Sequence, residues 1–309
     1  MRVLLTGAAG FLGSHLSKKL VGEGHTVIGI DDFSTGDMNN IKSLLSNPRF
    51  SIVNHDIRIP YHLKVDAILN FACPASPKHY QLDPVRTIET NFLGIINLLH
   101  LAKEFDAMLL QASTSEIYGD PTESPQKESY WGNVNPIGIR SCYDEGKRAA
   151  ETLCFDYKRQ FQLDTRVIRI FNTYGPNMAV DDGRVVSNLI VQALKNQPIT
   201  VYGDGEQTRS FCFVSDLING IYRVFERKSP INVPVNLGNP KEVSIIVLVA
   251  MILDLTNSNS EVIYKPLPED DPRQRQPDIT RAIKMFNWKP QIELDVGLQK
   301  TIEYFRSII

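Results

Sequence analysis

The chain has 309 residues, of which 42% are hydrophobic and 22% are charged, so it can bury a sizeable core and disorder is not expected. A formal net charge of −2 argues against nucleic acid or an anionic membrane surface as the main partner. No apolar run is long enough to span a membrane, and the N-terminus shows no signal-peptide pattern.

The cysteines and histidines indicate the compartment and argue against a metal. The four cysteines, Cys73, Cys142, Cys154 and Cys212, are scattered without a CxxC pair, which is typical of thiols in a reducing cytoplasm. The six histidines show no metal-binding spacing. We therefore expect a cytoplasmic protein without a metal site.

Strands and helices alternate through the first half of the chain. Apolar runs predict strands at residues 2–7, 26–30, 50–54, 67–71, 107–111 and 165–170. Amphipathic stretches predict helices up to about residue 23 and at 84–103 and 142–161. This alternation indicates right-handed βαβ units and a parallel sheet covered on both faces, which is a Rossmann-like, doubly wound α/β fold.

The pattern changes after about residue 172. Strands become short (200–202, 235–237 and 261–264), and helices are expected at 184–195, 215–226, 243–256, 279–287 and 294–307. We expect residues 1–172 to form the first domain, and residues 173–309 to form mainly a smaller α/β lobe with some chain crossing back. Such a lobe would lie over the carboxyl ends of the sheet, where doubly wound folds bind ligands.

The first strand is followed by Gly7-x-x-Gly10-x-x-Gly13, which opens a helix. These glycines permit a tight turn, the approach of a pyrophosphate to the backbone, and close packing of helix on strand. Asp31, after the second strand, would accept hydrogen bonds from a ribose diol and repel a 2′-phosphate, so NAD is favoured over NADP. Asp56, after the third strand, either meets the adenine edge or caps a turn.

Ser141-Cys142-Tyr143-Asp144-Glu145-Gly146-Lys147 places a tyrosine and a lysine on one helical face. The ammonium of Lys147 is expected to lower the pKa of Tyr143, so that the phenol can exchange a proton near neutral pH. The segment 112–119 follows the fifth strand and supplies the hydroxyl of Thr114, with Ser115 and Glu116 beside it. Together these groups could take a proton from an alcohol while a hydride leaves its carbon.

The chain resembles the extended short-chain dehydrogenase/reductases that act on nucleotide sugars, also described as the NAD-dependent epimerase/dehydratase family. Within that group it most resembles the UDP-glucuronate decarboxylase (UDP-xylose synthase) family. The segments that carry the resemblance span most of the chain. They are 74–77, 113–121, 130–138, 142–148, 169–176, 182–188 and 275–279.

The resemblance implies a reaction in three steps with NAD regenerated in place. Tyr143 deprotonates the sugar 4-hydroxyl as NAD takes the C4 hydride, the 4-ketone then allows CO2 to leave, and reduction gives UDP-xylose. It assigns Ser115 and Glu116 to the decarboxylation and to handling the C5 proton, and it places Arg275 near the substrate carboxylate. Ser115 stands where related dehydratases typically carry Asp.

The resemblance and the motifs together give a set of expected site residues. The expected catalytic residues are Tyr143, Lys147, Thr114, Ser115, Glu116 and Arg275. The expected cofactor residues are Gly7, Gly10, Phe11, Leu12, Gly13, Asp31, Asp32, Asp56, Ile57, Ala72, Tyr143 and Lys147. The expected UDP-sugar residues are Pro74, Tyr80, Arg86, Asn172, Val186, Tyr202, Arg209 and Arg275.

Two alternatives remain open. One is a UDP-sugar 4-epimerase or 4,6-dehydratase on the same fold, and Ser115 argues against the dehydratase. The other is a non-catalytic NAD-binding regulatory protein, although Thr114, Tyr143 and Lys147 are all present. Relatives pair through the helices at 84–103 and 142–161, so a homodimer is expected, with Leu98, Leu99 and Leu153 as candidate contacts unless they belong to the core.

Overall fold

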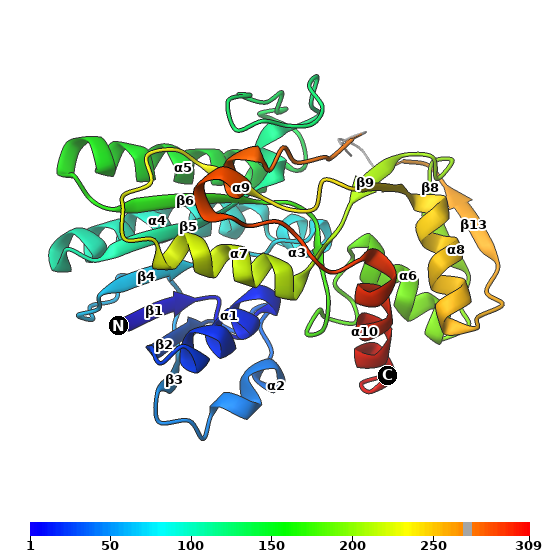
Figure 1. Ribbon diagram of the computed structural model, residues 1–309, viewed down its shortest axis with the longest axis horizontal. Helices are drawn as coiled ribbons and strands as arrows, with labels where there is room; N and C mark the ends of the chain where they lie inside the picture. The colour runs from blue at the N-terminus through cyan, green and yellow to red at the C-terminus, as the bar shows by residue number, and fades with distance from the viewer. Residues whose placement is uncertain (268–273) are drawn as a thin grey trace.

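The computed structural model describes residues 1–267 and 274–309, and its central feature is a seven-stranded sheet covered by helices (Figure 1). Its strand order is β11-β6-β5-β4-β1-β2-β3, and all of its neighbouring strands are parallel. The strands are β1 (Arg2–Thr6), β2 (Thr26–Asp31), β3 (Phe50–Asn54), β4 (Ala67–Asn70), β5 (Met108–Thr114), β6 (Thr165–Ile170) and β11 (Val235–Leu237). The order reverses between β1 and β4, which is where doubly wound sheets bind ligands.

Two pairs of helices cover the faces of the sheet. On one face α1 (Phe11–Gly22) packs against α7 (Val214–Glu226), and on the other α4 (Pro84–Phe105) packs against α5 (Ser141–Phe161). The central strands β4 and β5 are buried along their whole length, as expected of parallel strands covered on both sides. This rigid layer fixes the positions of the side chains at the strand ends.

Two of the candidate dimer contacts prove to be core residues. Leu98 and Leu99 on α4 are buried in the hydrophobic cluster between this helix and the sheet, together with Ala150 and Cys154 of α5. A helix between a sheet and a neighbouring helix buries more than one face, so its leucines could not be assigned from spacing alone. Leu153 is only partly buried.

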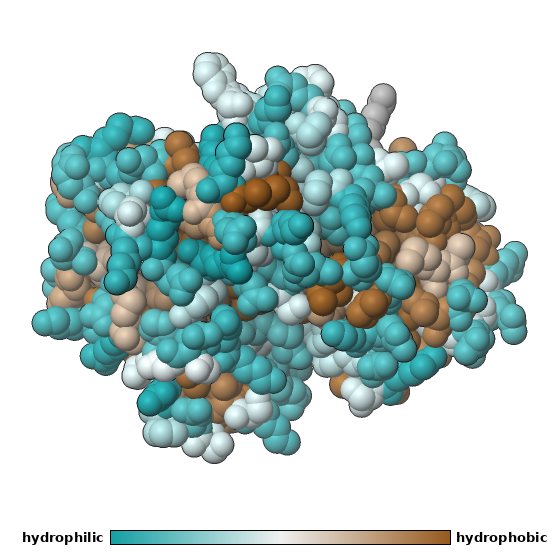
Figure 2. Space-filling view, viewed as in Figure 1, coloured by the Kyte–Doolittle hydropathy of each residue, from teal (hydrophilic) through white to brown (hydrophobic). Residues whose placement is uncertain are grey.

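The smaller lobe gathers α6 (Val185–Leu194), α8 (Ile245–Thr256) and α10 (Leu294–Arg306), which pack on one another. Its two-stranded sheets pair β8 (Ile199–Tyr202) with β13 (Val262–Lys265) and β9 (Thr208–Ser210) with β12 (Glu242–Ser244). Figure 2 shows apolar residues gathered over this lobe, whereas the rest of the visible face is mainly polar. The described chain contains no helix with the combined length and apolarity needed to cross a bilayer.

The chain returns to the large sheet after residue 173. Strand β11 pairs with β6 at the edge, and α7 packs on α1. The remaining short elements are α2 (Met38–Ile41), η1 (Lys42–Leu44), α3 (Pro77–Leu82), η2 (Ser115–Tyr118), β7 (Thr173–Tyr174), β10 (Cys212–Phe213) and α9 (Thr280–Phe286). Strands β7 and β10 pair with each other.

Several element boundaries differ from the predicted ones by one to three residues, and two of these differences are informative. Strand β5 continues to Thr114, so Ser113 and Thr114 end the strand itself rather than follow it. The helix predicted at 243–256 begins at Ile245, because Glu242–Ser244 forms β12 and the Ser244 hydroxyl accepts a hydrogen bond from the N–H of Val247.

Candidate active site

One cavity of about 830 Å³ lies at the carboxyl ends of the sheet strands, under the smaller lobe. Every residue expected at the cofactor, the substrate or the reacting atoms lines it. These residues are Gly7, Gly10, Phe11, Leu12, Gly13, Asp31, Asp32, Asp56, Ile57, Ala72, Pro74, Tyr80, Arg86, Thr114, Ser115, Glu116, Tyr143, Lys147, Asn172, Val186, Tyr202, Arg209 and Arg275. The fold therefore brings together residues that are up to 268 positions apart in the sequence (Gly7 to Arg275).

The glycine turn fits a dinucleotide. Gly7 has a φ of +68°, and a Cβ built on it would lie 2.7 Å from the carbonyl oxygen of Phe71. A Cβ on Gly13 would lie 1.9 Å from the carbonyl oxygen of Gly7, so no side chain fits at either position. Helix α1 begins at Phe11 without a side-chain cap, which leaves a helix N-terminus at the cavity for a pyrophosphate.

Asp31 braces this turn. Its Oδ2 accepts a hydrogen bond from the N–H of Ala9 at 2.8 Å, and its Oδ1 accepts one from the N–H of Phe33 at 2.9 Å. Burial raises the pKa of Asp31, and these two N–H groups partly offset that rise. The carboxylate is therefore fixed at the cavity wall, with lone pairs left for a ribose diol.

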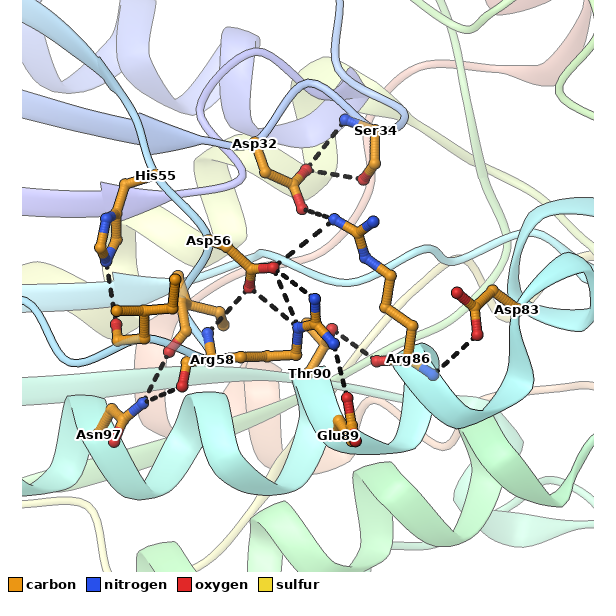
Figure 3. A network of polar contacts seen from close by, with 12 residues as sticks. Asp32, Ser34, His55, Asp56, Arg58, Asp83, Arg86, Glu89, Thr90 and Asn97 are labelled. Carbon is orange, nitrogen blue, oxygen red and sulfur yellow. Dashed lines mark hydrogen bonds and ion pairs between the residues drawn. The ribbon is translucent and has the colours of Figure 1, made fainter.

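Asp32 and Asp56 belong to a network of charged side chains at this end of the cavity (Figure 3). Nη2 of Arg86 lies 2.7 Å from Oδ2 of Asp32 and 3.6 Å from Oδ2 of Asp56. Arg58 donates to Asp56 and lies 2.6 Å from Glu89. Burial acts to raise the pKa of Asp56, but the hydrogen bonds from Arg58 outweigh it and leave that pKa below its usual value.

The position of Arg86 differs from the one expected. The resemblance suggested a place near the sugar pocket, but the guanidinium lies among carboxylates that follow β2 and β3, at the predicted adenosine end. Asp83 caps α4 by accepting a hydrogen bond from the N–H of Arg86, which fixes the start of the helix beside these strand ends.

At the other end of the cavity, the reaction end, the side chains of Tyr143, Lys147 and Thr114 are buried. The ring of Tyr143 stacks on Tyr80, with centroids 5.0 Å apart and planes 6° from parallel. Nζ of Lys147 donates to the carbonyl oxygen of Ala112 at 3.0 Å and lies 5.7 Å from the centre of the Tyr143 ring. The hydroxyl of Thr114 accepts a hydrogen bond from the N–H of Glu116 at 3.2 Å.

The expected lowering of the Tyr143 pKa is not found in this structure. Burial raises the pKa of Tyr143 well above its usual value, and the Thr114 hydroxyl offsets only part of that rise. Burial also lowers the pKa of Lys147, because the ammonium loses its water. Desolvation thus dominates the pKa of Tyr143, and the phenol of the protein without ligands keeps its proton at neutral pH.

Glu116 lies between two guanidinium groups. Its carboxylate is 3.1 Å from Nη2 of Arg275, and Arg140 contacts the same oxygen. Burial would raise the pKa of Glu116, but Arg275 and Arg140 outweigh it and hold that pKa far below its usual value. Glu116 was proposed as an acid or base, yet in this arrangement it is an anion that cannot give a proton.

Arg140 was not among the predicted residues. It stands one turn before Tyr143 at the start of α5, so helical spacing could have placed it on the same side of the cavity. Arg184 was also missed, and it lines the cavity with its guanidinium 5.5 Å from the centre of the Phe11 ring. Both arginines lie in the segments around the recognised motifs.

Arg275 reaches the cavity on a strand-like segment that crosses from the smaller lobe. Ser210 donates to the carbonyl oxygen of Arg275 at 3.1 Å, and the backbone of Arg209 forms a β-bridge with Arg275. Gln126 donates its N–H to the carbonyl oxygen of Gln276 at 2.8 Å. The side chain of Arg275 is 1% exposed and also donates to the carbonyl oxygen of Gly119.

The remaining predicted substrate residues lie on the smaller-lobe wall or near Tyr143. Asn172 precedes β7, Val186 is buried in the first turn of α6, and Arg209 is buried in β9. Tyr202 at the end of β8 is half-exposed at the cavity. Pro74 and Tyr80 line the cavity from the β4–α4 connection, and Tyr80 stacks on Tyr143.

Comparison with known proteins is consistent with this site. Residues 3–238 match the NAD dependent epimerase/dehydratase family. The chain is 52% identical over 307 residues to UDP-glucuronic acid decarboxylase 2 of Arabidopsis thaliana, covering 99% of this chain and 68% of that protein. It is 50% identical over 306 residues to UDP-glucuronic acid decarboxylase 1 of Xenopus tropicalis, covering 99% and 72%.

Solved structures give the same grouping. UDP-glucuronic acid 4-epimerase from Bacillus cereus, in complex with UDP-glucuronic acid and NAD, has a TM-score of 0.90 and 28% identity, with 100% of each chain covered. DesIV, a dTDP-glucose 4,6-dehydratase from Streptomyces venezuelae with NAD bound, has a TM-score of 0.90 and 25% identity, covering 99% of this chain and 97% of that one. This chain therefore belongs to the NAD-dependent epimerase/dehydratase family.

Proposed function

We propose that this protein is a UDP-glucuronate decarboxylase, a carboxy-lyase that converts UDP-glucuronate to UDP-xylose and CO2. The observation that carries the proposal is the pair of guanidinium groups, Arg140 and Arg275, beside the Tyr143 and Thr114 hydroxyls. A dehydrogenase pair next to a site for a carboxylate suits a sugar acid. Relatives that are 50–52% identical carry the name of this activity.

The first step is the oxidation of the sugar at C4. The glycine turn would hold NAD, which when bound would supply the oxidising power by accepting the C4 hydride and returning it at the end of the cycle. Tyr143 must first lose its own proton, which the positive charges of Lys147 and of a bound oxidised nicotinamide would favour. The phenolate then takes the proton of the 4-hydroxyl, and Thr114 holds the same oxygen through a hydrogen bond. Lys147, anchored on the carbonyl of Ala112, supplies the positive charge that stabilises the phenolate during this transfer.

The second step is the loss of CO2. The 4-ketone is β to the C6 carboxylate, so the electrons of the C5–C6 bond pass into the ketone as CO2 leaves. Arg275 and Arg140 orient the carboxylate, and a proton then returns to C5. Ser115, buried beside Glu116, places no negative charge next to the departing carboxylate.

Glu116 holds the two arginines in place before substrate binds. A substrate carboxylate would compete with Glu116 for these guanidinium groups. Once released from one or both arginines, Glu116 would have a higher pKa and could handle the C5 proton. This exchange assigns Glu116 an acid–base role that its ion pairs prevent in the protein without ligands.

The smaller-lobe wall suits the nucleotide. Arg209 supplies a cation for the diphosphate, and Tyr202 offers a ring that can border the uracil. Asn172 and Val186 lie along the same wall, and Pro74 and Tyr80 border the sugar near Tyr143. UDP would thus extend away from the reaction end and beneath the smaller lobe.

A homodimer is proposed as the state in solution. Val85, Ile88 and Phe92 form an exposed apolar stripe on α4 at helical spacing, with Phe92 44% exposed. This stripe replaces Leu98 and Leu99 as the proposed contact. Phe92→Glu should yield monomers in light scattering, whereas Leu82→Glu, an exposed site before this helix, should not.

A cytoplasmic location is proposed because the four cysteines are free thiols. Cys154 and Cys212 are buried, and Cys73 and Cys142 are partly buried near the reaction end. An oxidising compartment is where structural disulfides would be expected. Expression with a fluorescent tag in the native cell tests this location.

A product assay tests the activity. Incubation with UDP-glucuronate and NAD should release CO2 and form UDP-xylose in equal amounts, without accumulation of NADH. Accumulation of NADH together with a 4-keto pentose would instead indicate that the intermediate is released. Turnover of UDP-glucose or UDP-galactose without turnover of UDP-glucuronate would overturn the proposed substrate.

A further inference from the structure

The adenosine end of the cavity combines two features that indicate different cofactors. Carboxylates after β2 suit the free ribose hydroxyls of NAD, whereas an arginine near that ribose is a usual way to hold the 2′-phosphate of NADP. Asp31 is the last residue of β2, and Asp32 follows it. Arg86 reaches Asp32 from α4 (Figure 3). The preference therefore depends on what occupies the guanidinium of Arg86.

Asp31 and Asp32 are held differently. Both oxygens of Asp31 accept backbone N–H groups, so this buried carboxylate is part of the frame of the glycine turn. Asp32 is more exposed, with Oδ1 accepting from the N–H and hydroxyl of Ser34 and Oδ2 lying 2.7 Å from Arg86. Asp32 is thus the direct counter-ion of Arg86.

Asp56, the other carboxylate that the Arg86 guanidinium approaches, already pairs with Arg58. Asp56 lies 3.6 Å from Arg86 but accepts hydrogen bonds from Arg58 at 3.0 and 2.8 Å. Arg58 also contacts Glu89 at 2.6 Å. Carboxylates outnumber guanidinium groups in this network, so a dianionic 2′-phosphate meets a negative field while Arg86 is neutralised.

We propose that the Asp32–Arg86 ion pair sets the preference of this site for NAD over NADP. Arg86 could bind a 2′-phosphate, but its guanidinium is already paired with Asp32. Both side chains are partly exposed, at 37% for Arg86 and 27% for Asp32, so the guanidinium has room to meet a ligand once its partner is removed. The inference rests on the proposed position of the adenosine at the ends of β2 and β3.

Binding of adenosine fragments tests the pair directly. AMP and 2′,5′-ADP differ only in the 2′-phosphate, so the ratio of their affinities isolates the contact in question. Calorimetric competition against NAD would be measured for the unchanged protein, Asp32→Asn, Arg86→Gln and the double variant. Asp32→Asn should shift the ratio toward 2′,5′-ADP by about tenfold, because one anion is lost and one cation is freed.

The double variant shows whether Arg86 is the responsible group. Asp32→Asn combined with Arg86→Gln should lose that shift, and Arg86→Gln alone should move the ratio further toward AMP. Glu89→Gln is the matched control, because it removes a carboxylate of the same network that contacts Arg58 rather than Arg86. Its ratio should change by less than about twofold, since an exposed pair contributes little.

Two results would overturn the proposal. One is an equal shift toward 2′,5′-ADP in Asp32→Asn and in the double variant, which would assign the effect to the charge of Asp32 alone. The other is no shift in Asp32→Asn while Asp31→Ala still weakens NAD binding. If none of these substitutions, Asp31→Ala included, changes AMP or NAD affinity, the position assigned to the adenosine is itself wrong.

Discussion

The two ends of the cavity use charged side chains in different environments. At the reaction end Tyr143, Lys147 and Arg275 are buried, with Arg275 only 1% exposed. At the adenosine end Asp32 and Arg86 remain partly in contact with water. Both ends contain ion pairs of similar length, namely 3.1 Å for Glu116–Arg275 and 2.7 Å for Asp32–Arg86.

Burial therefore determines what the charged side chains at each end of the cavity can do. Charges interact more strongly where water is excluded, and unpaired charges there cost more. The reaction end can therefore fix which groups carry protons, as the shifted pKa values of Tyr143, Lys147 and Glu116 indicate. The adenosine end can select among ligands without strongly affecting stability.

The largest expected effect is on catalysis at the reaction end. Tyr143→Phe should lower turnover of UDP-glucuronate by roughly a thousandfold, because the proton acceptor for the 4-hydroxyl is lost. The affinity for NAD, measured by calorimetry, should change little. Retained turnover would exclude the acid–base role of Tyr143 and remove the main functional difference between the two ends.

The second largest effect is expected on stability, when the buried Glu116–Arg275 ion pair is broken. Arg275→Ala removes one of the two guanidinium groups that pair with Glu116, leaving Arg140, and should lower the free energy of unfolding by about 3 kcal/mol in urea. Lys241→Ala is the control, because its pair with Glu293 is more than 60% exposed on both sides and should contribute less than about 1 kcal/mol. Equal losses in the two variants would contradict the role assigned to burial.

The pH dependence of stability should report on Asp144. Burial and the charge of Glu116 raise the pKa of Asp144 from 3.8 to about 7, although Arg140 and Arg275 oppose them. Between these values the unfolded carboxyl has lost its proton while the folded one keeps it, so this residue reduces stability as pH rises from about 4 to 7.

Asp144→Asn removes that dependence. The stability of the variant relative to the unchanged protein should increase between pH 4 and 7 and then level off, by about 1.4 kcal/mol for each unit of pKa shift realised. Urea unfolding at several pH values measures it. A difference that is constant over this range, or that shrinks, would show that Asp144 titrates normally.

The smallest effect is expected at the adenosine end. Glu89→Gln breaks the 2.6 Å contact with Arg58, whose side chain is 27% exposed. The free energy of unfolding should fall by less than about 1 kcal/mol, and the loss should diminish further in high salt. A loss above about 2 kcal/mol would mean that this network is as important for stability as the buried one.

Much of the fold followed from local patterns. The glycine turn requires glycine for steric reasons, because Gly7 and Gly13 have no room for a side chain. Such positions can be recognised from their spacing in the sequence. The alternation of apolar runs with amphipathic stretches predicted the six strands that end at β6. Strand β11 was predicted as a short strand, but its pairing with β6 depends on the return of the chain, which spacing does not encode.

The contacts inside the site were less predictable. The direction of Arg86 depends on Asp32 and Asp56, which arrive from two other strands, and the second guanidinium on Glu116 comes from Arg140, 24 positions later. The pKa of Tyr143 depends on how completely water is excluded, which the Tyr-x-x-x-Lys spacing cannot specify. Sequence patterns thus identified the participating residue types better than their partners.

The most direct test of the account follows one hydrogen atom. UDP-glucuronate deuterated at C4 would be incubated with the protein and NAD in ordinary water, and the product analysed by NMR and mass spectrometry. We expect CO2 release and UDP-xylose that retains deuterium at C4, since the same cofactor would remove and return it. UDP-galacturonate formed without CO2, or UDP-xylose without deuterium at C4, would contradict it.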